Sequence, residues 1–265
     1  MKNILVTGAA GGMGKEICKL LIKNRYQVFG LDCKEPEETD SFHYISCDIT
    51  DTNSIEAAFT KVHEQVDRLD GIVHTAGIYD LDSLVEMDEE RFLRIFNINL
   101  FGTYRINKTF LPLLDKGSRI VITTSELAPL DPLPFTGIYA ITKGALEKYA
   151  YSLRMELNLL GIHVSIIRPG AVKTGLLSDS TRALDRFVEQ TKLYQCNAVK
   201  FRKIVDSVEA RNIPPTKIAQ IVLKALNSSR PKFLYNINQN VYLKLLNILP
   251  DRLQVFIIKE ILRTN

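Results

Sequence analysis

Residues 2–14, KNILVTGAAGGMG, join an apolar run to a glycine-rich loop. The apolar part, Asn3–Thr7, predicts a buried strand, and the apolar spacing in Gly14–Asn24 predicts a helix. A strand that passes through a tight glycine loop into a helix begins a βα unit, and such units build parallel sheets covered by helices. This stretch therefore favours an α/β fold at the start of the chain.

The alternation of strand and helix continues as far as Arg168. Strands are predicted at 27–32, 42–47, 70–75, 119–123, 163–168 and 231–235, and helices at 53–66, 88–114, 138–160 and 216–226. The strands are short, continuous and rich in Val and Ile, as strands are when helices cover both faces of their sheet. We predict a doubly wound, parallel, Rossmann-type α/β sheet with helices on both faces. It forms a single domain over residues 1–265, with a C-terminal helical extension at 236–265.

The composition is that of a globular protein, with 46% hydrophobic and 24% charged residues among 265. These proportions exclude a collagen-like chain, a disulfide scaffold and a wholly disordered chain. The formal net charge is +4, and basic residues are mixed with acids along the chain, so no nucleic-acid partner is predicted. The four cysteines and four histidines show no ligand-like spacing, so no metal site is predicted.

The sequence contains no segment typical of membrane insertion or export. No stretch of about 20 apolar residues occurs, so no membrane span is predicted. Met1 leads almost at once into the first strand, which leaves no room for a signal peptide. We therefore predict a cytoplasmic protein whose thiols are reduced.

The glycine loop has the composition of a phosphate-binding turn. A helix N-terminus carries unpaired N–H groups and a partial positive charge, which suit a pyrophosphate. Glycine lets the backbone approach the phosphates, and Gly14 lets the helix pack closely on the sheet. The residues predicted to form this site are Gly8, Gly11, Gly12, Met13 and Gly14. A glycine-rich turn without a ligand is the alternative interpretation.

Asp32 stands at the end of the second predicted strand, eighteen positions after Gly14. An acid at this place can bond both ribose hydroxyls of NAD, and it repels the 2′-phosphate of NADP. The glycine loop holds no Arg or Lys that could bind that phosphate, although Lys34 is close in sequence. We predict NAD as the cofactor, with NADP less favoured. A solvated acid at a strand end is the alternative.

Tyr139 and Lys143 lie four residues apart near the start of a predicted helix. Side chains at i and i+4 share a helix face, so the phenol and the ammonium group can meet. A nearby ammonium group favours the phenolate, and an oxidised nicotinamide would add a second positive charge. Such a tyrosine could exchange a proton near neutral pH. The same spacing also occurs in surface pairs that have no chemical role.

Together these motifs resemble those of the classical short-chain dehydrogenase/reductase family over nearly the whole chain. The spacing of Gly8, Gly12 and Gly14 is similar to that of the classical subgroup. Asn99, within NINLFG at 97–102, corresponds to the family's catalytic asparagine, and Ser125 corresponds to its catalytic serine. The further residues that the resemblance assigns to cofactor binding are Asp48, Ile49, Ala76, Gly77, Pro169, Gly170, Val172 and Thr174.

The resemblance implies hydride transfer between a nicotinamide cofactor and a carbinol carbon. Tyr139 would move the hydroxyl proton, and Ser125 would bind the substrate oxygen. Lys143 would lower the pKa of Tyr139 and bind the nicotinamide ribose, and Asn99 would hold a water that links Lys143 to solvent. A dinucleotide-binding regulator or scaffold without turnover is the alternative from another functional class, since a fold does not fix a function.

The chain departs from the family pattern at two places. The fourth strand ends in HTAG at 74–77, where the family has Asn-Asn-Ala-Gly, and Thr75 is expected to bond the backbone instead. Ser125 lies fourteen positions before Tyr139, slightly more than is usual in the family, and the loop at 129–134 is expected to absorb the difference. Thr124 is the competing candidate for the catalytic hydroxyl.

Two segments bear on the substrate. Residues 174–211 are polar and weakly periodic, and we expect them to form a mobile segment that covers the site. The extension at 236–265 carries an apolar stripe at helical spacing, which resembles the tails of family members that act on lipophilic alcohols. The stripe fits a wall around the substrate, a core or subunit contact, or a helix on a membrane surface. It consists of Val241, Leu245, Ile248, Leu249, Leu253, Phe256, Ile257 and Ile261.

A lipophilic secondary alcohol or ketone, such as a hydroxysteroid, is therefore the predicted substrate. A carbonyl reductase of the 3-oxoacyl type is the alternative enzyme. Reductases of that type commonly use NADP, which Asp32 opposes. By resemblance, the helices predicted at 88–114 and 138–160 would pair between subunits in a homodimer or homotetramer.

Overall fold

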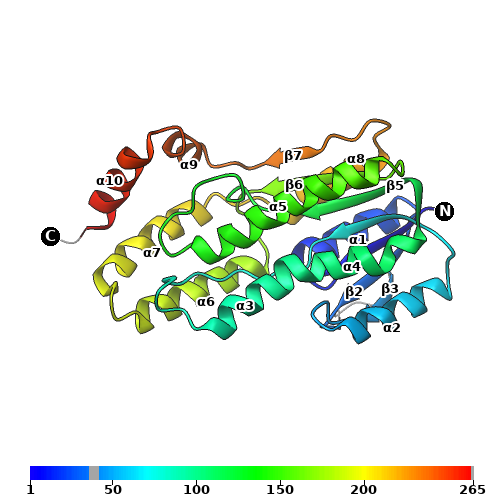
Figure 1. Cartoon of the computed structure of the whole chain (residues 1–265), viewed down its shortest axis with the longest axis horizontal. Coiled ribbons are helices and arrows are strands. Elements are labelled where there is room, and N and C mark those ends of the chain that lie inside the picture. The colour runs from blue at the N-terminus through cyan, green and yellow to red at the C-terminus, as the bar shows by residue number, and fades with distance from the viewer. Residues whose placement is uncertain (36–41, 264–265) are drawn as a thin grey trace.

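Seven parallel strands form one sheet in the computed structural model, which describes residues 1–35 and 42–263, except for the side chains of residues 177, 178, 208 and 209. They are β1 (Asn3–Thr7), β2 (Gln27–Asp32), β3 (His43–Ser46), β4 (Leu69–His74), β5 (Leu114–Thr123), β6 (His163–Pro169) and β7 (Leu234–Ile237). Their spatial order is β3-β2-β1-β4-β5-β6-β7 (Figure 1). The order reverses between β1 and β4, and the carboxyl ends of parallel strands open a crevice at such a reversal. The predicted fold class is confirmed.

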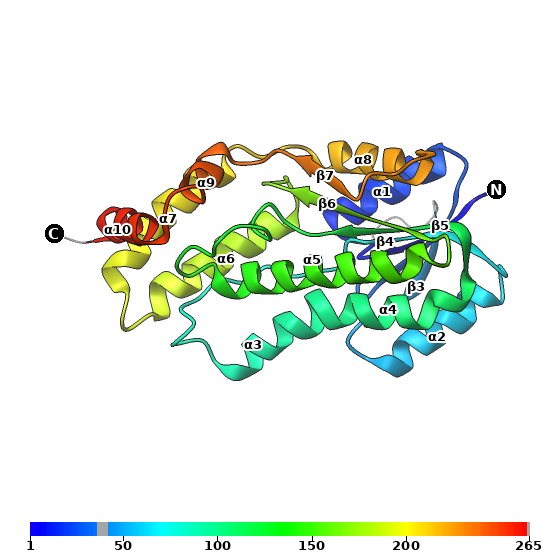
Figure 2. The ribbon, with the colours of Figure 1, turned by 45° about the horizontal axis from the view of Figure 1, so that its top comes forward.

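Helices cover both faces of this sheet. The helices of the described chain are α1 (Gly12–Lys23), α2 (Thr52–His63), α3 (Glu89–Phe96), α4 (Thr103–Phe110), α5 (Gly137–Asn158), α6 (Gly175–Gln190), α7 (Gln195–Glu209), α8 (Pro215–Asn227), α9 (Val241–Leu246) and α10 (Asp251–Leu262), and five of them cover the sheet. α1 and α8 lie on one face, and α2, α4 and α5 lie on the other (Figure 2). Within the described ranges, none of the helices combines the length and the hydropathy that a bilayer span requires.

β1 illustrates why the sequence produces two helical layers. Successive side chains of a strand point to opposite faces of the sheet. Ile4 and Val6 are buried in the cluster that includes α1 and α8, whereas Leu5 is buried in the cluster that includes α2, α4 and α5. Full burial of a side chain of this size contributes about 1.5–3 kcal/mol. A strand between two helical layers therefore needs an apolar residue at every position.

The single helix predicted at 88–114 is broken in the structure. α3 is followed by a π-helical segment at Asn97–Gly102, by α4, and by a 3-10 turn at Leu111–Leu113. β5 then begins at Leu114, earlier than the predicted Arg119. A π turn keeps the chain helical, so the spacing of apolar residues does not reveal it.

The final strand also differs from its prediction at 231–235. β7 begins at Leu234 and pairs with β6 as far as Ile237. Pro231 carries no N–H group to donate to a neighbouring strand, which explains why pairing begins later.

Residues 174–211 form two packed helices, α6 and α7, where the sequence predicted a polar, weakly periodic segment. These helices, together with α10, bury an apolar cluster of their own against Leu81 and Phe135. α6 contributes Leu184 and Phe187 to this cluster. The apolar residues of α6 lie at helical spacing, but this pattern was underestimated in the sequence because the segment contains many polar residues. We refer to α6, α7 and α10 as the covering lobe.

Polar contacts fasten the covering lobe to the loop after β4. Asp80 accepts a hydrogen bond from Arg91 of α3 at 3.1 Å and forms an ion pair with Arg186 of α6. Glu86 accepts a hydrogen bond at 2.6 Å from the hydroxyl of Thr191, which lies just after α6. The side chain of Asp80 is only 15% exposed, so its charge depends on these arginines for compensation. The end of β4 and the covering lobe are thus linked by charge as well as by apolar packing.

A buried polar chain joins the end of β4 to α4 and α5. The ring of His74 lies 2.8 Å, Nε2 to Oδ1, from Asn107, and Asn107 Nδ2 donates to the hydroxyl of Tyr149 at 3.0 Å. Burial lowers the pKa of His74 to about 4, because the charged ring would lose its hydration. His74 is therefore neutral at pH 7 and serves to hold two helices against the sheet.

The buried histidine predicts a pH-dependent loss of stability. The pKa of His74 is about 4 in the folded protein and 6.5 for a histidine in the unfolded chain, so the unfolded chain binds more protons between these values. The free energy of unfolding should fall by about 2 kcal/mol from this group between pH 7 and pH 4.5. His74→Gln should remove that part of the loss in urea unfolding, and His63→Gln, at an exposed histidine, should not. Equal pH dependence of wild type and His74→Gln would refute this assignment.

Candidate active site

Four buried polar side chains meet where α5 begins beside the ends of β4 and β5. α5 starts at Gly137, which places Tyr139 and Lys143 in its first two turns. Tyr139 is 6% exposed, Lys143 is 5% exposed and Ser125 is 7% exposed, while Asn99 in the π-helical segment is fully buried. Ionisable groups are rarely buried to this extent without a partner or a function. This cluster is therefore the candidate active site.

Lys143 reaches across to the strand that precedes Ser125. Its Nζ donates to the carbonyl oxygen of Thr123 at 3.3 Å and lies 5.7 Å from the centre of the Tyr139 ring. A Cβ added to Gly77 would lie 3.5 Å from this Nζ and 3.1 Å from Oδ1 of Asn99. Gly77 thus leaves room for the amine and the amide. Burial lowers the pKa of Lys143 to about 8.

The side chain of Asn99 joins the loop after β4 to α5. Its Oδ1 accepts from the N–H of Ile78 at 2.8 Å, and its Nδ2 donates to the carbonyl of Ile78 at 3.0 Å. The same Nδ2 lies 3.2 Å from the hydroxyl of Thr142, which in turn donates to the carbonyl of Tyr139. The side chain of Asn99 is therefore engaged with protein groups and positions the two segments that carry the site.

Ser125 and Tyr139 form a hydrogen-bonded pair of hydroxyl groups. Burial raises the pKa of Tyr139 to about 12, and the bond with Ser125 acts in the opposite direction. The ring of Tyr139 also packs on Tyr79, with the ring centres 4.6 Å apart. In the protein alone, the phenol therefore keeps its proton at neutral pH, and further positive charge is needed to release it.

The neighbouring hydroxyl of Thr124 is occupied elsewhere. It donates to Glu147 Oε1 at 2.9 Å and lies 3.2 Å from the carbonyl oxygen of Ile167. Glu147 in turn forms a buried ion pair with Arg168 on β6. This engagement leaves Ser125 as the hydroxyl that faces Tyr139.

The glycine loop is folded tightly against the end of β4. Gly8 has φ +71°, and a Cβ on it would lie 2.6 Å from the backbone nitrogen of Ala76. A Cβ on Gly14 would lie 2.0 Å from the carbonyl oxygen of Gly8. These two glycines are required by the turn itself. The turn brings the start of α1 to the carboxyl ends of β1 and β4, where Ala76 and Gly77 also lie.

The start of α1 has the properties of a phosphate site. Gly11 is its N-cap and makes no side-chain cap bond, and no acid occupies the first turn. A Cβ on Gly12 would lie 2.8 Å from Cβ of Thr174. Any side chain at position 12 would therefore fill the space in front of the N-terminus of α1. Met13 follows in the same turn and is half-buried. Uncapped N–H groups in a cradle without side chains fit the pyrophosphate of a dinucleotide.

The two predicted acids lie at the ends of neighbouring strands. Asp32 accepts through Oδ2 from the N–H of Ala10 at 2.9 Å and through Oδ1 from the N–H of Lys34 at 3.0 Å. Its carboxylate is therefore held at the edge of the glycine loop, where a ribose would follow the pyrophosphate. Asp48 is exposed and accepts from the N–H of Thr50 at 2.8 Å, just before α2.

Contacts within the protein fix one further predicted cofactor residue, Ile49, and the structural residue Thr75. Ile49 is 9% exposed, and a Cβ on Gly102 would lie 2.5 Å from its Cδ1. Ile49, which lies in the turn before α2, thus packs closely against the π-helical segment. Thr75, which replaces a family asparagine, donates to the carbonyl of Thr7 at 2.6 Å. It bonds the backbone, as the sequence predicts.

The segment after β6 crosses the mouth of the crevice. Pro169 ends β6, and the N–H of Gly170 donates to Ile237 of β7 at 2.9 Å. Val172 is buried, and Thr174 caps α6 by accepting from the N–H of Leu176 at 3.3 Å. The segment predicted to bind the carboxamide is thus fixed at both ends and passes beside Gly12.

Three residues near the site carried no clear signal in the sequence. Glu147 lies one turn beyond Lys143 and could have been placed on the same helix face, but its partner Arg168 is distant in sequence. Tyr79 follows the Ala-Gly motif by two residues. Glu126 is buried directly after Ser125 and accepts through Oε2 from the N–H of Asn240 at 2.5 Å. Only the folded chain reveals these pairings.

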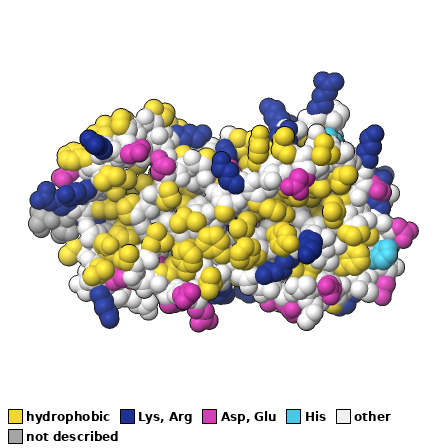
Figure 3. Space-filling view, viewed as in Figure 1, with side chains coloured by type: hydrophobic (Ala, Val, Ile, Leu, Met, Phe, Trp, Pro, Cys, Tyr) yellow, Lys and Arg dark blue, Asp and Glu magenta, His cyan; other side chains and the backbone are white. Residues whose placement is uncertain are grey.

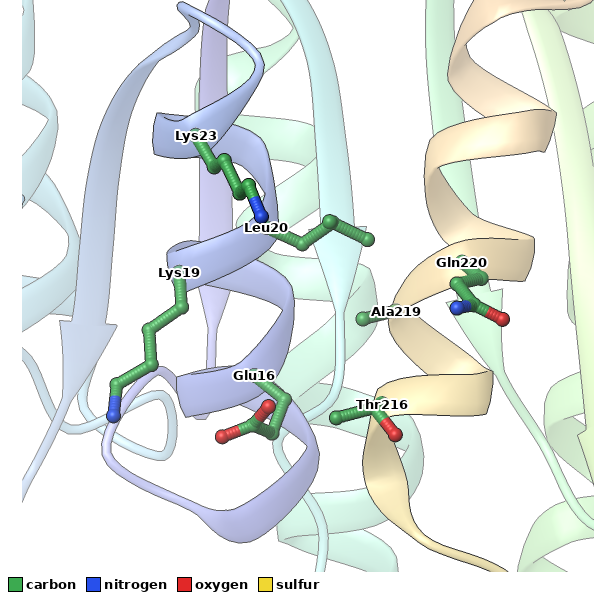
Figure 4. A pocket seen from close by; sticks show the side chains of 7 residues that line it. All are labelled: Glu16, Lys19, Leu20, Lys23, Thr216, Ala219 and Gln220. Carbon is green, nitrogen blue, oxygen red and sulfur yellow. The ribbon is translucent and has the colours of Figure 1, made fainter.

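Two hollows accompany the site without containing its predicted residues. A groove of about 270 Å³ lies between α1 and α8, lined by Glu16, Lys19, Leu20, Lys23, Thr216, Ala219 and Gln220 (Figure 4). A smaller cavity of about 110 Å³ lies behind Glu126, lined also by Ala171, Arg211 and residues 238–241. The first is a seam between two helices that cover the sheet. The second lies where the start of the C-terminal extension meets the segment after β6, with Asn238 Nδ2 donating to the carbonyl of Ala171 at 2.9 Å.

The chain is similar to proteins of known class. A family model described as short chain dehydrogenase matches residues 2–185. The chain is 25% identical to a 3-ketodihydrosphingosine reductase of Bacteroides thetaiotaomicron, over 97% of this chain and 96% of that protein. It is 30% identical to the estradiol 17-beta-dehydrogenase 2 of Mus musculus, over 91% of this chain and 69% of that protein. A short chain dehydrogenase family protein from Francisella tularensis superposes with a TM-score of 0.73 at 26% identity, over 89% of this chain and 97% of that one.

The buried ion pair behind Ser125 predicts a large cost for removing one partner. Glu147→Ala leaves the charge of Arg168 uncompensated and should reduce the free energy of unfolding by about 3–5 kcal/mol in urea titrations. Glu147→Leu combined with Arg168→Met should recover most of that loss, because an apolar pair needs no compensation. Glu156→Ala, at an exposed glutamate of the same helix, serves as the control. A loss from Glu147→Ala no larger than that of the control would contradict the assignment.

Proposed function

This chain belongs to the short-chain dehydrogenase family, and we propose that it interconverts a secondary alcohol and a ketone with NAD as its cofactor. One observation carries the proposal. A buried tyrosine hydroxyl is bonded to Ser125, and a buried lysine lies one helical turn away. Proton exchange at a hydroxyl group needs such a pair, whereas a binding protein without turnover has no use for it. The alternative of a regulator or scaffold is therefore disfavoured.

The residues of the glycine loop would hold the dinucleotide. Its pyrophosphate fits the start of α1, where Gly11 makes no side-chain cap bond. Asp32 would bond the adenosine ribose, and its charge would oppose the 2′-phosphate of NADP. Asp48 and Ile49 would flank the adenine. The remaining proposed contacts, to the ribose and the carboxamide of the nicotinamide half, are Ala76, Gly77, Tyr139, Lys143, Pro169, Gly170, Val172 and Thr174.

When bound, the nicotinamide supplies or accepts the hydride. In the oxidative direction, Tyr139 accepts the hydroxyl proton of the substrate at its phenolic oxygen. Its pKa of about 12 must fall for this step. The positive charges of a protonated Lys143 and of an oxidised nicotinamide would both act in that direction. Ser125 holds the substrate oxygen within reach of the phenol. Asn99 is a positioning residue, because its side chain holds the segment after β4 against α5.

We further propose a lipophilic substrate, of which a hydroxysteroid is one example. The covering lobe places an apolar cluster beside the site, and Tyr79 belongs both to this cluster and to the packing around Tyr139. Two similar proteins are named for substrates with extended apolar parts, a ketodihydrosphingosine and an estradiol. A reductase of 3-oxoacyl type is the second candidate within the same chemistry, and the charge of Asp32 disfavours the NADP that such reductases commonly use.

We also propose a homo-oligomer whose subunits contact one another through α4 and α5. The outer surface of these helices and of the π-helical segment carries exposed apolar side chains. They are Phe101, Tyr104, Ile141, Tyr151, Met155 and Leu159. A contiguous apolar surface of this kind is typical of an interface. A monomeric mass in light scattering at assay concentration would contradict this part of the proposal.

The proposed reaction predicts the outcome of a substrate panel. Hydroxysteroids and short secondary alcohols are offered with NAD and with NADP, and the absorbance of the reduced nicotinamide is followed. We expect turnover with NAD and a higher kcat/KM for the hydroxysteroids than for the short alcohols. Tight binding of NADH without turnover of any member would favour the regulator instead.

The proposed role of Asp32 predicts a change in cofactor preference. Asp32→Ser removes the charge that opposes the 2′-phosphate, so the ratio of kcat/KM with NAD to that with NADP should fall by about tenfold or more, about 1.4 kcal/mol. Asp67→Ser is the matched control, since Asp67 is an exposed acid outside the crevice. An unchanged ratio in Asp32→Ser would remove this residue from cofactor selection.

A further inference from the structure

α9 and α10 carry an apolar surface that no other part of the described chain covers. Eight of its side chains are between 43% and 77% exposed. They are Val241, Tyr242, Leu245, Ile248, Leu253, Val255, Phe256 and Ile261, and we call them the terminal surface. Isolated exposed apolar residues are ordinary, but eight of them on two consecutive helices and the turn between them indicate an interaction surface.

The terminal surface is separate from the face by which α10 joins the fold. Gln254 and Leu262 are buried, and Leu262 belongs to the apolar cluster of the covering lobe. Asn197 of α7 donates through Nδ2 to the carbonyl of Leu262 at 2.8 Å. α10 is therefore anchored on α7 through one side, and Phe256, 58% exposed, lies on the other. Most of the apolar stripe predicted in the sequence is therefore exposed and is not part of the core.

Basic side chains accompany the terminal surface. Residues 241–263 contain four basic residues, Lys244, Arg252, Lys259 and Arg263, and two acids, Asp251 and Glu260. Arg263 pairs with Glu260 at 3.6 Å, and Lys244 acts on the carboxylate of Glu126. Arg211 adds a further charge, because its guanidinium lies 5.6 Å from the ring centre of Tyr242. Figure 3 shows apolar side chains with basic and a few acidic ones among them at the end of the molecule where α9 and α10 lie.

We propose that the terminal surface docks onto anionic phospholipid bilayers. The apolar side chains of α9 and α10 would enter the headgroup region, and the surrounding lysines and arginines would contact lipid phosphates. A second copy of the chain is a poorer occupant, because a symmetric contact would bring the same excess of positive charge against itself. An anionic lipid surface satisfies both the apolar area and the charge.

The terminal surface is mechanically tied to the candidate active site. Asn240, the N-cap of α9, donates through its N–H to Glu126, the residue after Ser125. Asn247, just after α9, accepts through Oδ1 from the N–H of Asp131 at 2.6 Å. Docking would therefore hold the loop after Ser125 close to the bilayer, where lipophilic substrates are concentrated. This consequence rests on the proposed function, whereas the docking itself does not.

Vesicle sedimentation with the full-length protein tests the docking. Vesicles of phosphatidylcholine alone are compared with vesicles that also contain phosphatidylglycerol, at low and at high salt. We expect the protein to sediment with the anionic vesicles, to remain largely in solution with the neutral ones, and to be released by salt, which screens the charges. Absence of sedimentation with anionic vesicles at low salt would overturn the proposal.

Two pairs of substitutions assign the contact to its residues. Ile248→Glu with Phe256→Glu should weaken binding to anionic vesicles by about tenfold or more, because charges replace inserted apolar groups. Lys244→Glu with Lys259→Glu should do the same by reversing the attraction. The matched controls are Val85→Glu and Lys61→Glu, at exposed positions on other elements. Both controls should bind as wild type does, and a far-ultraviolet spectrum confirms that each variant is folded.

Other outcomes separate this proposal from its rivals. If Ile248→Glu with Phe256→Glu binds vesicles as wild type does but halves the mass in light scattering, the terminal surface is a subunit contact and the proposal fails. Equal binding of neutral and anionic vesicles would overturn the role of charge. Turnover of a water-soluble alcohol without vesicles should be the same in both substituted proteins and wild type. A loss of that turnover with normal vesicle binding would concern the proposed function and leave the docking intact.

Discussion

Burial of Tyr139 and Lys143 in the first turns of α5 is the constraint on which the arrangement around the site depends. Each side chain loses hydration, and the two effects push their pKa values toward the neutral forms, to about 12 and about 8. Neighbouring groups compensate for this loss of hydration. The carbonyl of Thr123 meets the amine, Ser125 bonds the phenol, and Gly77 leaves space where a side chain would press on Oδ1 of Asn99.

Three sets of contacts hold that arrangement. Asn99 fixes the loop after β4 to α5, and the pair of Glu147 and Arg168 fixes α5 to β6. Both act on rigid elements of the sheet and its helices. The covering lobe is attached differently, by its own apolar cluster and by the ion pair of Asp80 and Arg186. The chemical groups therefore belong to the central sheet, while the groups that would shape a substrate belong to a separate layer.

Much of this could be predicted from the sequence, because the signals are local. The strand, loop and helix at 2–24 place Gly8 and Gly14, and the spacing of four places Tyr139 beside Lys143. The sequence could not reveal the contacts between distant segments. Nothing marks Glu126 as the partner of Asn240, or His74 as the partner of Asn107. The π turn at Asn97–Gly102 was missed because it preserves helical patterning. The sequence left the place of the terminal stripe open between core or subunit contact, substrate wall and membrane surface, because periodicity does not tell core from surface.

The central claim is that Tyr139 exchanges the substrate proton, and Tyr139→Phe tests it most directly. NADH binding is followed by its fluorescence, and turnover is followed with the best substrate of the panel. The account predicts that NADH binds within about twofold of wild type while kcat falls by about a hundredfold or more. Tyr151→Phe, at an exposed tyrosine of the same helix, should leave both unchanged. A Tyr139→Phe protein that binds NADH and turns over as fast as wild type would contradict the account.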